Sequence, residues 1–311
     1  MPPTDRPNRM MAASGAILLY AVLIAYIDNY VRVIADGTGL WQFQAMRSGL
    51  VVLVVLGAMA LPFAPRLRVV APGPVLARAV VQSAAMFTYF GSLGFLTVAQ
   101  AAAGLFTAPI FVMLIGRFVY GHTIGPVRVV AALAGFAGVV MVLSPDPADL
   151  KPAMLVPVLG GALYGLANIA TREWCAKESA AVLTVSYMLV MGVLAALVLL
   201  ALWLIAPEAP PGRDGFLIRG PNLPEPVVLF WIAVQAIGSL IAVGLMVRAY
   251  QLAEASRVSV LEYVVLPFSA IWAWVIWGET IGPVAVLGMG LIVAAGVAMT
   301  WRGRAGQGRA A

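Results

Sequence analysis

The chain alternates long apolar runs with short polar breaks. A helix needs about 20 apolar residues to cross the hydrocarbon core of a bilayer, and each run is close to that length. Proline and glycine, which interrupt helices, mark breaks at Ala64 to Arg66, Pro72 to Pro74 and Ser144 to Pro147. The pattern predicts an all-α integral membrane protein with ten transmembrane helices, at residues 13–35, 40–62, 74–96, 99–119, 125–144, 152–172, 180–206, 226–250, 257–277 and 281–301.

A seven-residue motif occurs twice along this pattern. Gly121 to Val127 reads Gly-His-Thr-Ile-Gly-Pro-Val and Gly278 to Val284 reads Gly-Glu-Thr-Ile-Gly-Pro-Val, so six of the seven positions are identical. Pro109 and Pro267 precede the two copies at nearly equal distances. Because an odd number of predicted spans separates the copies, they fall at opposite faces of the membrane. The repeat therefore predicts two inverted five-helix units around a central cavity, as in secondary transporters.

The repeat also predicts how the chain is divided. The expected segments are an N-terminal tail (1–12), a first five-helix repeat (13–144), a linker (145–151), a second five-helix repeat (152–301) and a C-terminal tail (302–311).

Composition leaves no room for a sizeable soluble domain. Of the 311 residues, 62% are hydrophobic and 10% are charged, whereas soluble domains are about half apolar. The first apolar run follows Arg6 and Arg9, as a secretory signal would. It is longer than the apolar core of such a signal and lacks a small-residue cleavage pattern. We therefore expect it to be retained as a helix.

Basic residues are distributed unevenly among the predicted loops. If the N-terminus is cytoplasmic, only Lys151, Arg213 and Arg219 lie outside. Cytoplasmic loops of membrane proteins carry an excess of Lys and Arg, so both termini are predicted to be cytoplasmic. The net charge of +6 then reflects orientation, and we expect the lipid bilayer but no nucleic acid as a partner. The residues in or beside cytoplasmic segments are Arg6, Arg9, Arg66, Arg68, Arg78, Arg117, Arg128, Arg172, Lys177, Arg248, Arg257, Arg302, Arg304 and Arg309.

Few side chains are available for catalysis or metal binding. Cys175 and His122 are the only cysteine and histidine, so we expect no intrachain disulfide, no metal centre, no cofactor and no catalytic residue. A Walker-type phosphate loop is also missing, which favours gradients over ATP as an energy source. An intramembrane enzyme acting on a lipid is one alternative, but it would need clustered reactive groups. A passive channel or a structural membrane protein is another, which the repeat disfavours.

Charged residues inside the predicted spans are the best pointers to a site, because each needs a partner or a water-filled cavity. Asp28 and Arg47 both lie seven residues from the outer end of their span, which at 1.5 Å per residue is about 10 Å deep. They could form a salt bridge that fixes the first hairpin, or face the cavity and contact a charged group of the substrate. Arg32 lies one helical turn from Asp28 and is expected to reach the outer surface.

Glu262 is the second candidate for a functional charge. It stands early in the ninth predicted span, directly before Tyr263 and five residues before Pro267. A carboxylate beside a helix-breaking proline can reach a cavity, and burial would favour its protonated form, which suits proton exchange. The alternative is a structural carboxylate bonded to Arg248 or Arg257. Its counterpart in the first repeat is near Gly104, so the shared framework does not require it.

Uncharged polar and aromatic residues complete the candidate set. Tyr164 and Asn168 are four residues apart and share one helical face. Hydrogen bonding between helices is the alternative explanation for each of them. The candidates for substrate binding or coupling are Asp28, Arg47, Gln44, Gln82, Tyr89, Tyr164, Asn168, Tyr187, Gln235, Glu262 and Tyr263.

Several segments carry a family resemblance across nearly the whole chain. In order they are Ala99 to Ala103, Pro109, Gly121 to Gly125, Arg248 to Ala253, Leu261 to Tyr263, Leu266 to Phe268 and Gly278 to Thr280. They resemble the EamA-type branch of the drug/metabolite transporter superfamily. One position departs from that pattern, since the first repeat has His122 where the family often has glutamate.

The resemblance implies ten helices in two inverted repeats, alternating access and residence in a bacterial inner membrane. Cargo among such relatives includes amino acids, nucleosides, vitamins and sulfonium metabolites. The resulting hypothesis is a secondary transporter for an amino acid or a polar heteroaromatic metabolite, such as a nucleoside, a vitamin or an S-adenosyl compound. Proton coupling, a monomeric or homodimeric state and the direction of transport stay open at this point.

Overall fold

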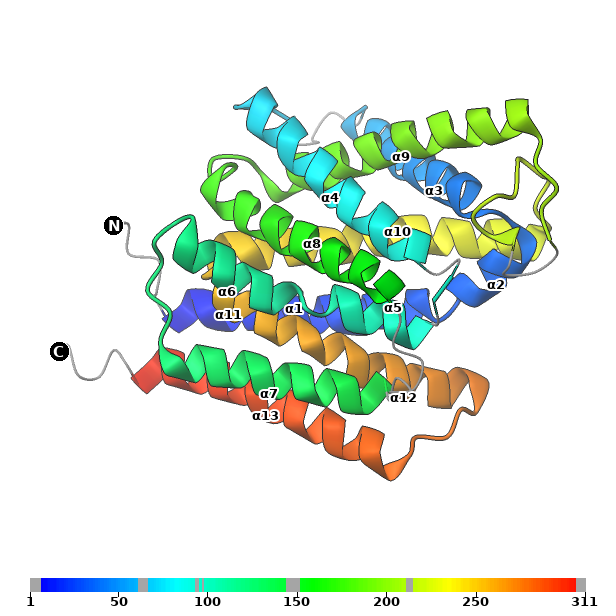
Figure 1. Cartoon of the computed structure of the whole chain (residues 1–311). Helices are drawn as coiled ribbons and strands as arrows, with labels where there is room; N and C mark the ends of the chain where they lie inside the picture. The colour runs from blue at the N-terminus through cyan, green and yellow to red at the C-terminus, as the bar shows by residue number, and fades with distance from the viewer. Residues whose placement is uncertain are drawn as a thin grey trace.

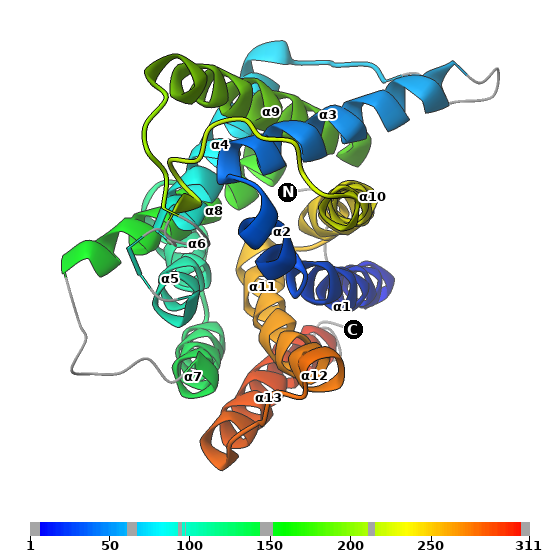
Figure 2. The same cartoon turned by 90° about the vertical axis from the view of Figure 1, so that its right-hand side faces the viewer.

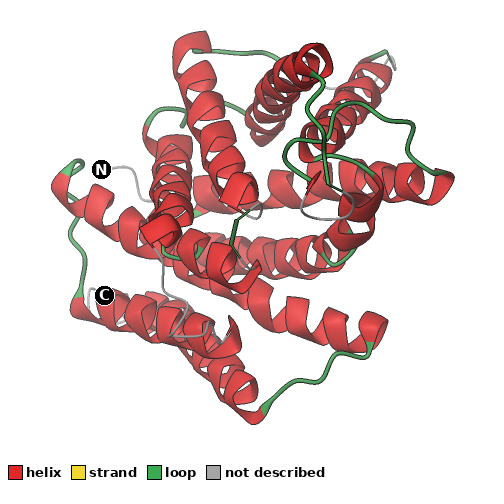
Figure 3. Ribbon diagram, turned by 45° about the vertical axis from the view of Figure 1, so that its right-hand side comes forward, coloured by secondary structure: helices red, strands yellow, loops and turns green. Residues whose placement is uncertain are grey.

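The computed structural model describes residues 7–60, 67–92, 95–96, 98–143, 152–210 and 215–305. Within these ranges the regular elements are all helices, as Figure 3 shows by colour. The predicted linker 145–151, with Lys151, and the basic residues Arg6, Arg66, Arg213 and Arg309 lie outside them. The helices are α1 (Pro7–Asp28), α2 (Val31–Gly37), α3 (Leu40–Met59), α4 (Pro72–Ser92), α5 (Val98–Leu105), α6 (Ala108–Phe118), α7 (Pro126–Leu143), η2 (Pro152–Met154), α8 (Leu155–Glu173), α9 (Ala180–Ile205), α10 (Pro226–Leu252), α11 (Ala255–Leu261), η4 (Glu262–Val264), α12 (Val265–Trp277) and α13 (Pro283–Ala305).

Nine segments of the described chain are long and apolar enough to cross a membrane, and each overlaps a predicted span. The chain is therefore an all-helical, multi-pass membrane protein. The remaining prediction, 74–96, falls on α4, which is not among the nine. Arg78, Gln82 and Ser83 lower the apolar character of α4, and all three side chains are buried inside the protein.

Three of the predicted spans are broken rather than continuous, which corrects the runs 13–35, 99–119 and 257–277. The first breaks after Asp28, where the Asn29 side-chain amide donates to the Ala25 carbonyl at 2.8 Å and competes with the helical ladder. The other two break just before Pro109 and Pro267. Proline has no N–H to donate and disturbs the preceding turn, so both helices bend at that point.

The two copies of the repeated motif adopt the same backbone conformation. Gly121 and Gly278 have φ angles of 68° and 67°, in the left-handed region that favours glycine. The prolines at the ends of the copies, Pro126 and Pro283, start α7 and α13. The sequence repeat is therefore also a repeat of local structure.

Each motif turn is tied to the end of the first span of the other repeat. In the first turn, the His122 Nε2 lies 3.4 Å from the Glu173 Oε1 at the end of α8. In the second turn, the Glu279 Oε1 lies 2.8 Å from an Arg32 Nη2 on α2. Equivalent turns thus make equivalent side-chain contacts at opposite ends of the bundle.

Figure 1 places the start of α1 and the end of α13 at the same end of the helix bundle, which we call the terminus end. Helix α1 runs away from this end and α8 runs toward it. Main packing partners are α1 with α10 and α12, α8 with α4 and α6, α3 with α9, and α7 with α13. Seen along the bundle in Figure 2, the groups around α1 and α8 are joined by α3 with α9 on one side and α7 with α13 on the other.

Backbone contact between glycines brings α7 and α13 together. A Cβ atom added at Gly138 would lie 2.6 Å from the Gly288 carbonyl oxygen, and one added at Gly288 would lie 2.7 Å from the Gly138 carbonyl oxygen. Small residues allow this approach, which is a common way to pack helices in a membrane.

Candidate functional site

Asp28 stands at the last residue of α1, where the first span breaks. Its Oδ1 accepts a hydrogen bond of 3.2 Å from the Gln235 Nε2, which also donates to the Ile27 carbonyl at 2.8 Å. Gln235 comes from α10 and is fully buried, whereas Asp28 itself is exposed. The carboxylate is thus held by the neighbouring helix, while part of the residue stays exposed at the surface of the bundle.

Arg47 from α3 lies on the same side of the bundle as Asp28 but does not form the predicted salt bridge. Among the described ion pairs within 4.0 Å, none joins the two residues. They interact through longer-range electrostatics, and the Arg47 guanidinium interacts with the Tyr187 hydroxyl. The guanidinium carbon lies 5.4 Å from the centre of the Phe43 ring. Tyr89 from α4 also lies within electrostatic range of Asp28.

Several buried polar atoms on α3, α4 and α10 have no partner within the described residues. Gln44 is fully buried, and neither its Nε2 nor its Oε1 has a hydrogen-bond partner within the described residues. The Gln82 Oε1, the Gln235 Oε1 and the Arg47 Nε are in the same state. Leaving a buried polar group unsatisfied costs about 1–3 kcal/mol. Several such groups together therefore point to ordered water or a bound ligand as the missing partner.

Glu262 forms a second group with tyrosines. The Tyr164 hydroxyl donates to the Glu262 Oε2 at 3.0 Å, and the Tyr250 hydroxyl interacts with the same carboxylate. The Asn168 Nδ2 donates to the Tyr250 Oη at 3.1 Å. Glu262 and Asn168 are buried, and the Glu262 Oε1 and Asn168 Oδ1 have no partner in the part of the chain described. The predicted Tyr164–Asn168 face therefore meets Glu262 and Tyr250.

The arginines considered as partners of Glu262 are engaged elsewhere or exposed. The Arg257 Nε lies 3.8 Å from the Glu254 Oε2, and Arg128 forms an ion pair with the same carboxylate. Arg248 is exposed on α10. Tyr263 turns away from its neighbour Glu262, because its ring packs against Gly135 of α7 and lies 6.2 Å from the Phe106 ring. Tyr263 thus belongs to an apolar cluster rather than to the Glu262 group.

Three residues near these groups were not selected from the sequence. Tyr20 on α1 interacts with the Tyr164 hydroxyl and lies within electrostatic range of both Asp28 and Glu262, so it lies between the two groups. Tyr250 lies inside the Arg248 to Ala253 segment that carried the family resemblance, which was the available signal. Arg78 was assigned to orientation, but it is fully buried and its Nε donates to the Thr171 Oγ1 at 2.6 Å.

No cluster of three or more His, Cys, Asp or Glu side chains that could hold a metal occurs in the described ranges. The arrangement has instead two carboxylates inside the membrane, each bonded to uncharged polar groups from other helices. Such groups can bind polar solutes or exchange protons.

Residues 151–301 match the family described as the EamA-like transporter family. The match lies in the second half of the chain, which is similar to this family. An EamA-like protein is a transporter of the drug/metabolite transporter superfamily rather than an enzyme. The family match therefore confirms the resemblance found in the sequence.

Similar proteins extend the comparison over the whole chain. A riboflavin transporter of Rhizobium johnstonii is 25% identical over 92% of this EamA-like chain and 87% of its own length. An S-adenosylmethionine uptake transporter of Rickettsia bellii is 28% identical over 62% of this chain and 60% of its own length. A solved crystal structure matches 96% of this chain and 98% of its own chain with a TM-score of 0.72 at 18% identity, which supports the fold.

Proposed function

We propose that this EamA-like protein is a secondary transporter that carries a small organic metabolite between two inverted five-helix repeats. The observation that carries the proposal is the set of buried, partnerless polar atoms on Gln44, Gln82, Gln235 and Arg47, together with the hydrogen bond that joins Gln235 to Asp28. A cargo with hydrogen-bond donors and acceptors would satisfy these atoms. In a protein with no need to bind a solute, such unsatisfied groups in the membrane would be selected against.

Alternating access is supported by a difference between equivalent helix pairs. Helices α8 and α10 meet through the Asn168–Tyr250 bond and through Tyr164, whose hydroxyl lies 2.8 Å from the Met246 sulfur. The pair that corresponds to them in the first repeat is α1 and α4, which have no comparable interface in the described chain. We infer that the protein is closed toward the terminus end in this state and that the cargo reaches Asp28 from the opposite end. Exchange of these two arrangements would move the cargo site across the membrane.

The cargo that fits best is a polar heteroaromatic metabolite or an amino acid. Glutamine amides pair with donor and acceptor edges of the kind that such rings and amide groups present. The opposite charges of Asp28 and Arg47 suit a zwitterion. The names of two relatives, a riboflavin transporter and an S-adenosylmethionine uptake transporter, support this class of compound for the present chain.

The transport proposal is tested by counterflow. Purified protein in proteoliposomes loaded with unlabelled riboflavin, S-adenosylmethionine or an aromatic amino acid should accumulate the matching labelled compound, and excess unlabelled cargo should compete. Asp28→Asn should lower this exchange at least tenfold, or by about 1.4 kcal/mol, because the carboxylate that Gln235 holds is lost. Asp36→Asn, which removes an exposed acid on α2, serves as the matched control. Flux that does not saturate would indicate a channel, and no flux for any such solute would contradict a carrier.

We further propose a bacterial inner membrane location with both termini in the cytoplasm. Arg117, Arg128, Arg172 and Arg257 lie at the terminus end, in agreement with the excess of basic residues expected on the cytoplasmic side. The glycine turns of the two repeats then lie on opposite sides of the membrane.

The two equivalent turns allow a direct test of this topology. In a Cys175→Ser background, Glu279→Cys should react with a membrane-impermeant maleimide in intact cells, whereas His122→Cys should react only after permeabilisation. Both positions are partly exposed, so access from one side decides the result. Labelling of both residues from outside would overturn the inverted arrangement, and labelling of His122→Cys alone would overturn the cytoplasmic location of the termini.

A further inference from the structure

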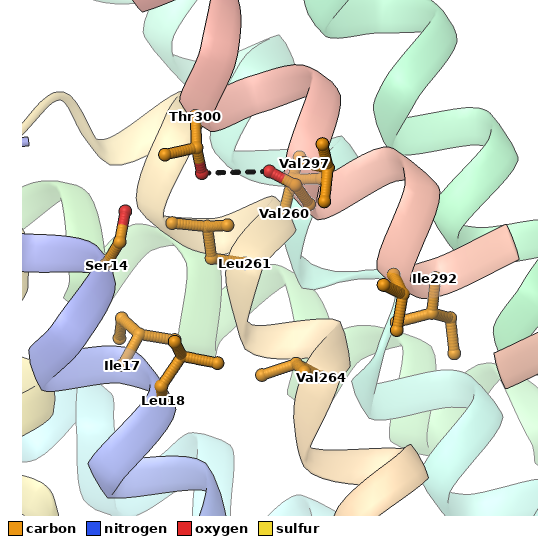
Figure 4. A pocket seen from close by; sticks show the side chains of 11 residues that line it. Ser14, Ile17, Leu18, Val260, Leu261, Val264, Ile292, Val297 and Thr300 are labelled. Atoms are coloured by element: carbon orange, nitrogen blue, oxygen red, sulfur yellow. Dashed lines mark hydrogen bonds between the residues drawn. The ribbon is translucent and has the colours of Figure 1, made fainter. Parts of the chain in front are cut away.

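A cleft between three helices lies apart from the two polar groups. Its walls come from α1, from the α11 and η4 segment and from α13, and its volume is about 380 Å³. Figure 4 shows that side chains from these three elements surround one common space. The cleft lies toward the terminus end, where α1 and α11 begin and α13 ends.

The cleft is apolar and open toward the outer surface of the bundle. Ile17, Val260 and Ile292 are buried and line its inner side, while Leu18 and Val297 are exposed at its mouth. Ser14 and Thr300 contribute hydroxyl groups to the lining. The Thr300 hydroxyl already donates to the Gly296 carbonyl at 3.0 Å. In a multi-pass membrane protein this outer surface faces lipid, so the solvent at the mouth of the cleft is the hydrocarbon of the bilayer.

All three helices that form the cleft carry arginine between it and the terminus end. Arg9 precedes Ser14 by five residues on α1, which is about 8 Å along the axis. Arg257 precedes Val260 on α11, and Arg302 and Arg304 follow Thr300 in the sequence. Arginines at this depth lie where lipid headgroups meet the protein. Basic sites between helices on the cytoplasmic side favour anionic headgroups.

We propose that this cleft binds one acyl chain of an anionic phospholipid whose phosphate lies at the terminus end of the cleft, where Arg9 is exposed and where the sequence adds arginines after Thr300. The apolar lining matches the chain, and the basic rim selects the headgroup. Leu261 and Val264 line the cleft on either side of Glu262 in the sequence, so a bound lipid packs against the segment that holds this carboxylate. Lipid in the cleft therefore supports the bent backbone at η4.

Native mass spectrometry of the detergent-purified protein tests the site with two lipids of equal chain length, phosphatidylglycerol and phosphatidylcholine. We expect retained phosphatidylglycerol to exceed phosphatidylcholine several-fold. Gly296→Leu should remove most of this adduct, because a Cβ at Gly296 lies 3.5 Å from the Leu261 Cδ2 and a longer side chain enters the cleft. Gly290→Leu on the same helix is the matched control, since a Cβ there meets no atom within 4 Å.

The headgroup preference is tested separately from the cleft. Arg9→Gln combined with Arg302→Gln should equalise the two lipids, whereas Arg117→Gln, an exposed arginine on α6, should not. Equal retention of both lipids by the unmodified protein would overturn the proposal, as would an unchanged adduct in Gly296→Leu. A lipid-free dimer that dissociates only in Gly296→Leu would show that a second copy of the chain fills the cleft instead.

Discussion

Glu262→Gln is expected to abolish the response of transport to an imposed proton gradient and to lower gradient-driven uptake at least tenfold, or by about 1.4 kcal/mol. Glutamine keeps the size of the side chain and can still accept the hydrogen bond from Tyr164, but it cannot take up and release a proton. Uptake into proteoliposomes, measured with and without a pH difference across the membrane, provides the readout.

Two further variants separate coupling from folding. Tyr164→Phe removes the donor to the Glu262 Oε2 and should weaken the gradient response while leaving the carboxylate in place. Tyr263→Phe removes a neighbouring hydroxyl that has no partner and faces an apolar cluster, so it should transport normally. A folded Gln variant with unchanged rates and an unchanged gradient response would exclude proton coupling through Glu262. Failure of Glu262→Gln to fold would assign the carboxylate a structural role.

The absence of an equivalent carboxylate in the first repeat strengthens the case for Glu262. Its counterpart region contains Gly104, where an added Cβ would lie 2.6 Å from the Pro157 Cβ of α8. A glutamate cannot be placed there without moving the two helices apart. The framework therefore closes in the first repeat with no carboxylate, and the one in the second repeat is an addition to it. An addition that leaves a buried Oε1 without a partner is easier to explain by function than by stability.

The sequence predicted the membrane class and the repeat because both depend on local features. Apolar length locates the spans, and Gly121 and Gly278 adopt a backbone conformation that their residue type favours. Helix breaks were missed at Asn29 and before Pro109 and Pro267, since apolar runs continue through them. The side-chain amide of Asn29 and the missing N–H of each proline disturb only one turn of a helix. The length of an apolar run does not change at such a turn, so it cannot reveal the break.

The candidate site was predicted in part. The depth of a residue in the membrane can be read from its position within an apolar run, whereas the direction in which its side chain points around the helix axis depends on how the helices pack. Tyr164 and Asn168 lie on one face of α8, as predicted. Tyr164 contacts Glu262 and Asn168 contacts Tyr250. Asp28 and Arg47 have equal depth, yet the partner at hydrogen-bonding distance from Asp28 is Gln235 from a helix far away in the sequence. Such pairing is decided by how helices pack and turn about their axes. The burial of Arg78 is likewise decided by how α4 packs against its neighbours.

Gly288→Leu is expected to destabilise the protein by about 3 kcal/mol, at the upper end of the usual cost of overpacking. A Cβ at Gly288 would lie 2.7 Å from the Gly138 carbonyl oxygen and 2.8 Å from the Met141 Cβ. Backbone atoms cannot rotate out of the way as a side chain can, so α7 and α13 must separate. These helices come from different repeats, and their contact is one of several that hold the repeats together.

A lower Tm of the purified protein in detergent, followed by tryptophan fluorescence or by loss of the monodisperse peak on size exclusion, would report this damage. Gly290→Leu is the matched control, because the same side chain is added on the same helix half a turn away, where a Cβ meets no atom within 4 Å. A large Tm loss for Gly288→Leu alone would locate the effect at the α7–α13 contact. Equal Tm values for the two variants would mean that this glycine contact does not hold the two repeats together.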